Sequence, residues 1–411
     1  MDKTIGLACN IFTGKLDANQ AVTGGEYPFF TCAEYPDQID HFTYDDDVVL
    51  VAGNNARGNF HVSRYKGKFN AYQRTYILTA KKGFNIDYVY YALKLELKRL
   101  REKSQGSQTK FLTMPILTGI HFRDITGDEQ TEIANVLSAI DKKIELNNRI
   151  NAELESMAKT LYDYWFVQFD FPDDSPQGQG KPYKTSSGKM VYNPTLKREI
   201  PKGWEVDTLS SWIKSDKTGD WGKEEQEGNY TIQVDCIRGA DINGLNGNGK
   251  INAPNRFILR KNDHKLLAPF DFVIEISGGS PTQSTGRMAY ITDDVLNRFP
   301  HPLICSNFCK AISLHNKDLF YCFAYLWGNL YDNGILFGWE GKTSGIKNLL
   351  FDAFVTKYYV AVPPVHLAKQ FFDFVAPLEQ KKQSLLKESS KLETLRDWLL
   401  PMLMNGQVTV K

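Results

Sequence analysis

Apolar residues recur along residues 128–165 in steps that alternate between four and three positions, which is the spacing of a coiled-coil seam. This pattern predicts one long helix that begins at Asp128, whose side chain is a suitable N-cap. Such a helix is too long to be an ordinary core helix, so it needs a partner along its apolar stripe. The seam positions are Ile133, Leu137, Ile140, Ile144, Leu154, Ala158, Leu161 and Trp165.

Two asparagines occupy the middle of this seam. Asn147 and Asn151 continue the same spacing between Ile144 and Leu154. A buried asparagine weakens an apolar seam, but it fixes the register and the choice of partner. We therefore expect the helix to pair in one specific way.

A second seam with the same spacing runs through the C-terminal part of the chain, and only Lys381 and Glu388 interrupt its apolar pattern. Pro377 lies inside it, and because proline has no amide hydrogen we expect a kink or a break there. Taken alone, two unrelated amphipathic surface helices explain both patterns as well as a packed pair does. The positions of the second seam are Leu367, Phe371, Phe374, Leu378, Lys381, Leu385, Glu388, Leu392, Leu395, Leu399 and Met402.

Short matches at constant spacing indicate that the chain is a tandem repeat. Residues 154–157 match 392–395, and 107–110 match 344–347, at shifts of 238 and 237 positions. Near the start, residues 13–15 match 218–220 and 25–27 match 228–230, at shifts of 205 and 203. The second copy therefore holds an insertion, and the repeat favours a pair of equivalent helices.

The sequence thus predicts an α+β fold with a pseudo-two-fold internal repeat. Two similar globular domains, each a mixed sheet with helices, are separated by two long antiparallel coiled-coil helices. The connector between the repeats is dense in Pro, Gly, Ser and Asp, so we expect it to run extended over the surface. The expected boundaries are 1–127 for the first domain, 128–167 for the central helix, 168–203 for the connector, 204–363 for the second domain and 364–411 for the C-terminal helix.

Runs of β-branched and aromatic residues predict strands at 27–32, 47–52 and 71–79, followed by a helix at about 87–103. Residues 270–276 match the strand at 47–52. Residues 53–70, expected as a loop, are rich in Asn, Arg, Lys and Gly, and 278–287 take their place in the second copy. These side chains are the types that contact phosphates and base edges, although an ordinary solvated loop has the same composition.

Composition narrows the classes of function. The net charge of the 411 residues is only +1, so any nucleic-acid surface must be local. Six cysteines form no CxxC pair and seven histidines do not cluster at ligand spacing, so we expect no metal. The N-terminus does not read as a signal peptide and no apolar run approaches about 18 residues, so we expect a cytoplasmic protein without a membrane span.

Catalytic motifs are incomplete. Gly341-Lys342-Thr343 would end a P-loop, but the glycine required five residues earlier is Leu336. Residues 244–249 are glycine-rich without the spacing or the strand-to-helix context of a dinucleotide site. Residues 193–196 lack the second proline and the aromatic residue of an amino-methyltransferase motif. The sequence therefore predicts no catalytic residue and no cofactor.

Seven segments, taken together and in this order, resemble the specificity subunit of type I restriction–modification systems over essentially the whole chain. The resemblance implies a non-catalytic subunit whose two target recognition domains each read one half of a bipartite, asymmetric site on double-stranded DNA. It implies that the helices set the half-site spacing. It also implies docking of two copies of an S-adenosylmethionine-dependent methylation subunit, joined by a motor–nuclease restriction subunit. The segments are 25–33, 106–113, 129–147, 161–172, 180–193, 200–205 and 395–408.

One departure concerns the start of the first domain. The second domain opens with Ile200–Trp204, and the first has no equivalent before Thr4, so we expect the chain to begin slightly late relative to the repeat.

Candidate DNA contacts are chosen by side-chain chemistry, because the loops of this family vary between members. In the first domain they are Asn54, Asn55, Arg57, Asn59, Arg64, Lys66, Lys68 and Arg74, and in the second Gln283, Ser284, Arg287, Lys310 and Lys342. Asn307 and Arg256 are further polar or basic candidates in the second domain. A rival hypothesis is a coiled-coil scaffold that holds two protein-binding modules and makes no DNA contact. A self-contained methyltransferase or nuclease is disfavoured because cofactor and metal motifs are missing.

Overall fold

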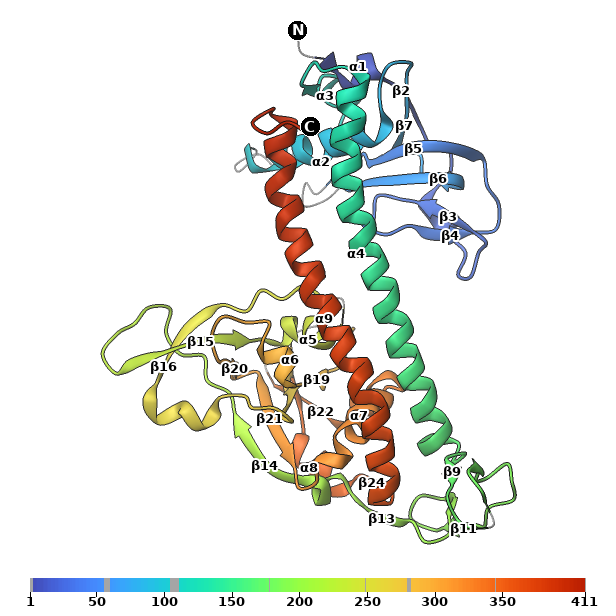
Figure 1. Ribbon diagram of the computed structural model, residues 1–411, viewed down its shortest axis with the longest axis vertical. Helices are drawn as coiled ribbons and strands as arrows, with labels where there is room; N and C mark the ends of the chain where they lie inside the picture. The colour runs from blue at the N-terminus through green and yellow to red at the C-terminus, as the bar shows by residue number, and fades with distance from the viewer. Residues whose placement is uncertain are drawn as a thin grey trace. The chain divides into compact units, whose positions relative to one another are not determined.

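The computed structural model describes residues 3–54, 60–103, 111–176, 178–247, 249–278, 282–343 and 345–410. Two compact units divide the chain: Met1–Glu145 with Ser390–Lys411, and Leu146–Ser389. Each unit holds one globular domain and one part of both long helices, α4 (Gly127–Tyr162) and α9 (Val365–Met404) (Figure 1). No helix within these described ranges is long and apolar enough to cross a membrane.

The first domain is built on a six-stranded mixed sheet with the order β2-β7-β5-β6-β3-β4. All neighbours are antiparallel except β3 and β6, which run parallel. The strands are β2 (Cys9–Thr13), β3 (Tyr27–Phe30), β4 (Asp37–Ile39), β5 (Tyr44–Ala52), β6 (Val62–Ala71) and β7 (Thr75–Ala80). The predicted strands at 27–32 and 47–52 are confirmed, but 53–70 is not one loop, because β6 fills its second half.

Residues on β5 alternate between the two faces of this sheet, as the pleat requires. Val49 and Val51 pack with helix α2 (Ile86–Lys103) and the start of α4, whereas Val48 and Leu50 face Phe69 on the other side. Both faces are therefore covered, which explains the continuous apolar run at the end of β5. The predicted helix at 87–103 is confirmed.

The second domain carries its central sheet in the order β14-β21-β17-β19 and two smaller sheets, β16-β15-β20 and β18-β23-β22. Helix α7 (Phe320–Asp332) packs on the central sheet through Phe320, Phe323 and Trp327. Short helices α5 (Ile242–Asn246), α6 (Asp293–Leu296) and α8 (Phe351–Lys357) complete the domain. The strands are β14 (Ile213–Thr218), β15 (Tyr230–Ile237), β16 (Asn255–Leu259), β17 (Phe272–Glu275), β18 (Ser277–Gly278), β19 (Met288–Tyr290), β20 (Leu303–Cys305), β21 (Cys309–Leu314), β22 (Glu340–Thr343) and β23 (Ile346–Leu349).

The two domains share one topology, which confirms the internal repeat. β2-β7-β5-β6 in the first corresponds to β14-β21-β17-β19 in the second, and the parallel pair β3–β6 corresponds to β15–β20. In each domain a helix follows, α2 or α7, and then a short one, α3 (Met114–Thr118) or α8. A small antiparallel pair then precedes the long helix: β1 (Lys3–Thr4) with β8 (His121–Phe122), and β13 (Glu205–Thr208) with β24 (Tyr359–Val362).

The repeated Thr-Gly motif has a steric reason. A Cβ placed on Gly14 would lie 2.1 Å from the carbonyl oxygen of Ala71, and one on Gly219 would lie 2.0 Å from that of Ser306. In both copies the backbone that follows the first strand of the central sheet, β2 or β14, lies against the backbone of a neighbouring segment. Only glycine allows this approach.

The two long helices pack against each other in antiparallel directions. In the first unit, Arg396 Nη1 donates to Asp141 Oδ1 at 2.9 Å. In the second, Asn147 Nδ2 donates to Ser389 Oγ at 3.2 Å, and Tyr162 lies 5.9 Å from Phe371 between ring centroids. Rising numbers on α4 therefore meet falling numbers on α9.

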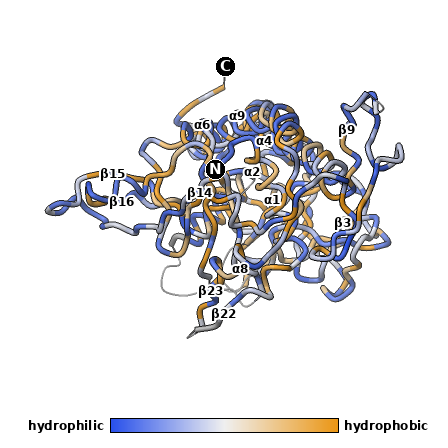
Figure 2. Tube along the Cα trace, turned by 90° about the horizontal axis from the view of Figure 1, so that it is seen from below, coloured by the Kyte–Doolittle hydropathy of each residue, from blue (hydrophilic) through white to orange (hydrophobic). Residues whose placement is uncertain are grey.

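Burial along α4 follows the spacing of four and three. Of the seam positions, Ile133, Leu137 and Ile144 are buried, as are Asn147 and Asn151, and Ile140, Leu154 and Leu161 are half-buried. Hydrophilic and hydrophobic positions both occur along the two long helices (Figure 2).

Three positions of the predicted α9 seam are wrong by one residue, whereas Leu367 is buried as predicted. Phe374 is 43% exposed, and Val375 is fully buried in its place. Lys382 and Ser389 are likewise buried where Lys381 and Glu388 were expected. The reason is that α9 also packs on the second domain, so its buried stripe is wider than a coiled-coil seam. Five other seam positions lie on the expected face of the helix: Phe371 and Leu385 are buried, and Leu378, Leu392 and Leu399 are half-buried.

Two expected helix features are also wrong. Thr126, not Asp128, caps α4: its Oγ1 accepts the amide of Glu129 at 3.2 Å, and Glu129 Oε2 accepts the amide of Thr126 at 2.9 Å. This reciprocal pair is a capping box. Pro377 does not break α9, which is helical from Val365 to Met404.

The connector is compact, not extended. It follows a π-helical turn, Asp163–Val167, and forms two antiparallel hairpins, β9–β10 (Pro172–Asp173 with Lys181–Pro182) and β11–β12 (Met190–Asn193 with Arg198–Pro201) (Figure 1). Phe171 stacks on Tyr183 and Trp204 at 4.8 and 5.4 Å between ring centroids. These rings belong to a small hydrophobic cluster that the connector shares with Leu367 of α9 and with the β13–β24 pair.

Replacing Asn151 by leucine should stabilise the second unit. The side chain is buried, and within the described part of the chain neither atom of its amide has a hydrogen-bond partner. Leucine has a similar volume and no polar atom to desolvate, so the free energy of unfolding should rise by about 1–3 kcal/mol. Urea unfolding followed by circular dichroism measures it. Asn147→Leu is the matched control, because it removes bonds to Glu388 and Ser389 and should not stabilise. A lower unfolding free energy for Asn151→Leu would contradict this account.

Alanine at Gly219 should destabilise the second domain by at least about 1–3 kcal/mol, because its Cβ would overlap backbone atoms. Gly328 is the control: it lies in α7, and a Cβ there meets nothing within 4 Å. Gly328→Ala should stabilise by about 1 kcal/mol through helix propensity. Thermal unfolding of the two variants compares these effects, and equal melting temperatures would refute the steric explanation of the motif.

Candidate nucleic-acid interface

At one end of the central sheet the two domains share the same backbone hydrogen bonds. In the first, Gly53 N donates to Arg74 O and Leu112 N donates to Gly53 O, both at 2.8 Å. In the second, Ile276 N donates to Phe308 O at 2.9 Å, and Leu349 N donates to Ile276 O at 2.8 Å. Three separate segments are therefore joined in the same way twice. We name these two triplets, Gly53-Arg74-Leu112 and Ile276-Phe308-Leu349, the sheet-end frame.

In the first domain the frame gathers an amide, a guanidinium and an aromatic ring. Asn54 forms an isolated antiparallel bridge with Phe111, and the Arg74 guanidinium lies 6.0 Å from the centre of the Phe111 ring. Phe111 is 54% exposed although it is apolar. Two residues chosen from the sequence, Asn54 and Arg74, thus lie together at the sheet end. Phe111 was missed, although it directly follows the repeated segment at 107–110.

In the second domain the frame borders a cavity of about 600 Å³. Phe308 is 53% exposed beside it, next to the exposed Asn307. Trp221 forms another wall and carries the Arg256 guanidinium 4.1 Å from its ring centre. Asn307 and Arg256 were candidates from the sequence, whereas Phe308 and Trp221 were not predicted. The cavity is lined further by Arg238, Glu275, Ser277, Gly278 and Ile346.

Three candidate residues of the first domain lie on strand β6 rather than in a loop. Arg64 Nε donates to Asp87 Oδ1 at 2.6 Å, and its Nη1 also pairs with Asp47, so this guanidinium ties β5, β6 and α2 together. Lys66 is 79% exposed, with Nζ 3.8 Å from Asp47, and Lys68 is exposed over the ring of Phe42. The candidates Asn55, Arg57 and Asn59 lie outside the described residues.

Two charged candidates of the second domain are held in ion pairs inside it. Arg287 donates from Nε and Nη2 to the two carboxylate oxygens of Glu275, both at 2.8 Å, and this hydrogen bonding raises the pKa of Arg287. Lys310 pairs with Asp216 at 2.8 Å and with Asp352 at 3.2 Å. Their charges are therefore compensated within the domain.

The remaining candidates of the second domain give no cluster. Ser284 is buried and donates to the carbonyl of Thr285. Gln283 is exposed, and its carbonyl accepts from Lys347. Lys342 lies on β22, and its side chain is not among those described.

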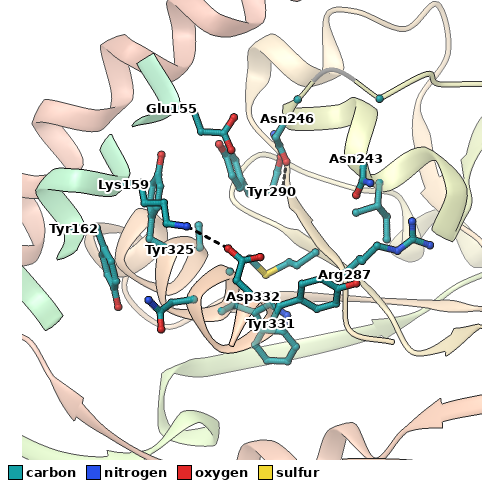
Figure 3. Close-up of a pocket in the computed structure, with 18 of the residues that line it drawn as sticks. Glu155, Lys159, Tyr162, Asn243, Asn246, Arg287, Tyr290, Tyr325, Tyr331 and Asp332 are labelled. Carbon is teal, nitrogen blue, oxygen red and sulfur yellow. Dashed lines mark hydrogen bonds and ion pairs between the residues drawn. The ribbon is translucent and has the colours of Figure 1, made fainter. Parts of the chain in front are cut away.

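Arg287 and Gln283 line a different cavity, of about 690 Å³, which lies within the second unit. Figure 3 shows Lys159 of α4 reaching toward Asp332 of α7, an ion pair of 3.3 Å, with tyrosine side chains around them. Lys382 of α9 is buried at this cavity and pairs with Glu379 at 2.9 Å. Because its cations are paired with carboxylates, this cavity offers little excess charge to a polyanion.

The buried thiols of Cys236 and Cys305 are not suited to act as nucleophiles. Burial raises the pKa of Cys236 and of Cys305 to about 12, so both are protonated at neutral pH. Among the residues that the structure describes, no group of three or more His, Cys, Asp or Glu could hold a metal ion. The chemistry available at the sheet end is hydrogen bonding and stacking.

Known proteins are similar to this chain in amino-acid sequence. Residues 2–156 match the type I restriction modification DNA specificity domain. The chain is 30% identical over 227 residues to the EcoDI specificity subunit of Escherichia coli, covering 53% of this chain and 48% of that protein's length. It is 25% identical over 350 residues to the MjaIX specificity subunit of Methanocaldococcus jannaschii, covering 80% of this chain and 71% of that protein.

A solved structure extends the likeness of fold to nearly the whole chain. The crystal structure of the type I restriction–modification S subunit from M. genitalium superimposes with a TM-score of 0.59 and 19% identity, covering 98% of this chain and 96% of that one. The paired long helices and the two mixed-sheet domains described above are therefore those of a known fold. In sequence, the chain is similar to specificity subunits of type I restriction–modification systems, and it spans about half the length of the Escherichia coli relative.

Proposed function

We propose that this chain is the DNA sequence-specificity subunit of a type I restriction–modification complex. Each domain recognises one half of a bipartite, asymmetric site on double-stranded DNA. The sheet-end frame is the observation that carries the proposal: the same backbone arrangement occurs twice and presents different side chains each time. A symmetric dimer reads two identical half-sites, whereas a duplicated chain is free to read two different ones.

In this proposal the chain is non-catalytic and positions other subunits on DNA. Two copies of a methylation subunit and a motor–nuclease restriction subunit supply the chemistry, in the cytoplasm. The names of the similar proteins, which are specificity subunits of restriction enzymes, support such an assembly. The net charge of +1 also favours it, because phosphate contacts supply most of the affinity for DNA and this chain has no excess of basic residues.

The two long helices would set the distance between the half-sites. Their contacts fix one register: the seam holds the Asn147 amide against Ser389 in the second unit and an Asp141–Arg396 ion pair in the first. Polar groups at single seam positions specify register and partner. A fixed register gives a fixed number of base pairs between the half-sites.

Exchanging residues 1–125 for the same unit of a relative should change one half-site and leave the other unaltered. Each frame is built from residues of its own domain, so the domains should act independently. Methylome sequencing of cells that express the chimera with its methylation subunit measures both half-sites. A change in both would contradict one domain per half-site. If neither the parent chain nor the chimera directs methylation to any site, the scaffold without DNA contact is the better account.

Inserting one heptad into each long helix, after Glu145 and after Ser389, should widen the gap and keep both half-sites. Seven residues preserve the seam and add about 10 Å at about 1.5 Å per residue. This corresponds to about three base pairs at 3.4 Å each. The same sequencing reads the gap, and inserting a heptad into α4 alone is the control, because it shifts the register and should abolish methylation. An unchanged gap with both insertions would show that the helices do not set it.

A further inference from the structure

We propose that the second domain reads its half-site with the cavity at its sheet end, where Trp221, Arg238, Asn307 and Phe308 determine specificity. The first domain reads its own with Asn54, Arg74 and Phe111 on the equivalent surface. This inference rests on the proposed function and assigns it to residues. It replaces the charged candidates Arg64, Arg287 and Lys310, because their ion-paired side chains are at most 21% exposed, against 36% for Arg238.

Strand registers show that the two surfaces are equivalent. Ala52 pairs with Thr75 at the end of β5, and Glu275 pairs with Cys309 at the end of β17. The parallel ladders also correspond, because Phe30 pairs with Ala71 and Ile237 with Cys305. Thr31 of the first domain and Arg238 of the second therefore follow equivalent strand positions. Both line hollows at the sheet end.

The hollows differ greatly in size. In the first domain the hollow has a volume of about 10 Å³, and Pro36 and His61 are among its lining residues. In the second it has about 600 Å³, and Gly239, Ala240 and Gly278 line it. Small residues thus leave space in one copy that larger ones close in the other. The first domain presents a filled surface with Arg74 over Phe111, and the second presents a recess.

The side chains at the recess are those that read base edges. Arginine and asparagine supply the hydrogen bonds that distinguish bases in the major groove, and apolar groups contact the thymine methyl. Asp241 and the carbonyl of Asn252 fix the orientation of Arg238, because its Nε donates to Asp241 Oδ2 at 2.9 Å and its Nη2 donates to Asn252 O at 2.5 Å, and its side chain is 36% exposed. Phe308 is exposed at a position that the frame fixes through its carbonyl.

A local structural role does not account for Phe308. It is half-exposed and belongs to none of the buried clusters of the described residues, unlike Phe320 and Phe323 in the core of the same domain. Trp221 is partly buried: it packs against the cluster that holds Val234 and Ile258, and it forms the cavity wall under the Arg256 guanidinium. An exposed ring beside an aromatic wall and hydrogen-bond donors is a surface suited to a base edge.

The test uses the full chain assembled with its methylation subunit and a library of sites with randomised half-sites. Asn307→Ala, Phe308→Ala and Trp221→Ala should each relax discrimination by roughly tenfold or more at one or more positions of the second half-site. The first half-site should stay unchanged. Arg74→Ala should relax discrimination at the first half-site and leave the second half-site unchanged. Tyr192→Ala is the control, because this exposed aromatic lies on the connector hairpin, and it should alter neither half-site.

The outcomes separate this inference from the function on which it rests. If the parent chain directs methylation to a bipartite site and the three variants leave the second half-site unchanged, the inference is wrong and the proposed function stands. If the parent directs none, the proposed function fails. A variant that loses its methylation subunit in a pull-down but keeps its half-site would show that the recess docks protein and would overturn the inference. Asn307→Ala and Phe308→Ala alter exposed residues, so they decide the question even if Trp221→Ala does not fold.

Discussion

The sheet-end frame of both domains depends on hydrogen bonds that involve no side chain. In both domains a residue just after a strand of the central sheet forms backbone hydrogen bonds with two other segments. One segment lies just before the neighbouring strand of the sheet, and the other lies later in the chain, at Leu112 or Leu349. Because amides and carbonyls are the same in every residue, this frame survives the replacement of almost every side chain on it. Gly53 is an exception in the first domain, since a Cβ there would lie 2.3 Å from the carbonyl oxygen of Arg74. A frame of this kind can be duplicated and then diverge in what it presents.

The long helices follow a different rule. Their stability comes from apolar burial on two sides, since α9 packs on α4 and on the second domain through residues such as Phe371 and Val375. Buried polar groups then limit how these surfaces fit together. Lys382 donates to the hydroxyl of Tyr290, Gln383 donates to the carbonyl of Leu245, and Asn147 bonds to Glu388 and Ser389. Each bond is lost if the helix slides or turns, so register is specified more sharply than by apolar contacts alone.

The sequence was informative where a single periodicity decides the structure. The α4 positions, the repeat and the strands at 27–32 and 47–52 follow from spacing and composition. The sequence was not informative where a side chain packs against two elements or pairs with a residue that is distant in the sequence. Phe374 was expected in the seam, but α9 buries Val375 because the second domain also covers that helix. Arg64 and Arg287 were chosen for their charge, and nothing in the local sequence reveals that Asp87 and Glu275 lie against them. Phe111 and Phe308 were missed because an aromatic residue usually indicates a core.

The most direct measurement of the central claim maps where DNA lies on the two domains. Duplex DNA with 5-iododeoxyuridine placed in each half-site can be photo-crosslinked to the chain in complex with its methylation subunit, and the crosslinked peptides identified by mass spectrometry. The account predicts crosslinks at Phe111 from one half-site and at Trp221 or Phe308 from the other. Crosslinks confined to Lys66 and Lys68 on β6, or to the cavity that Arg287 lines, would contradict it.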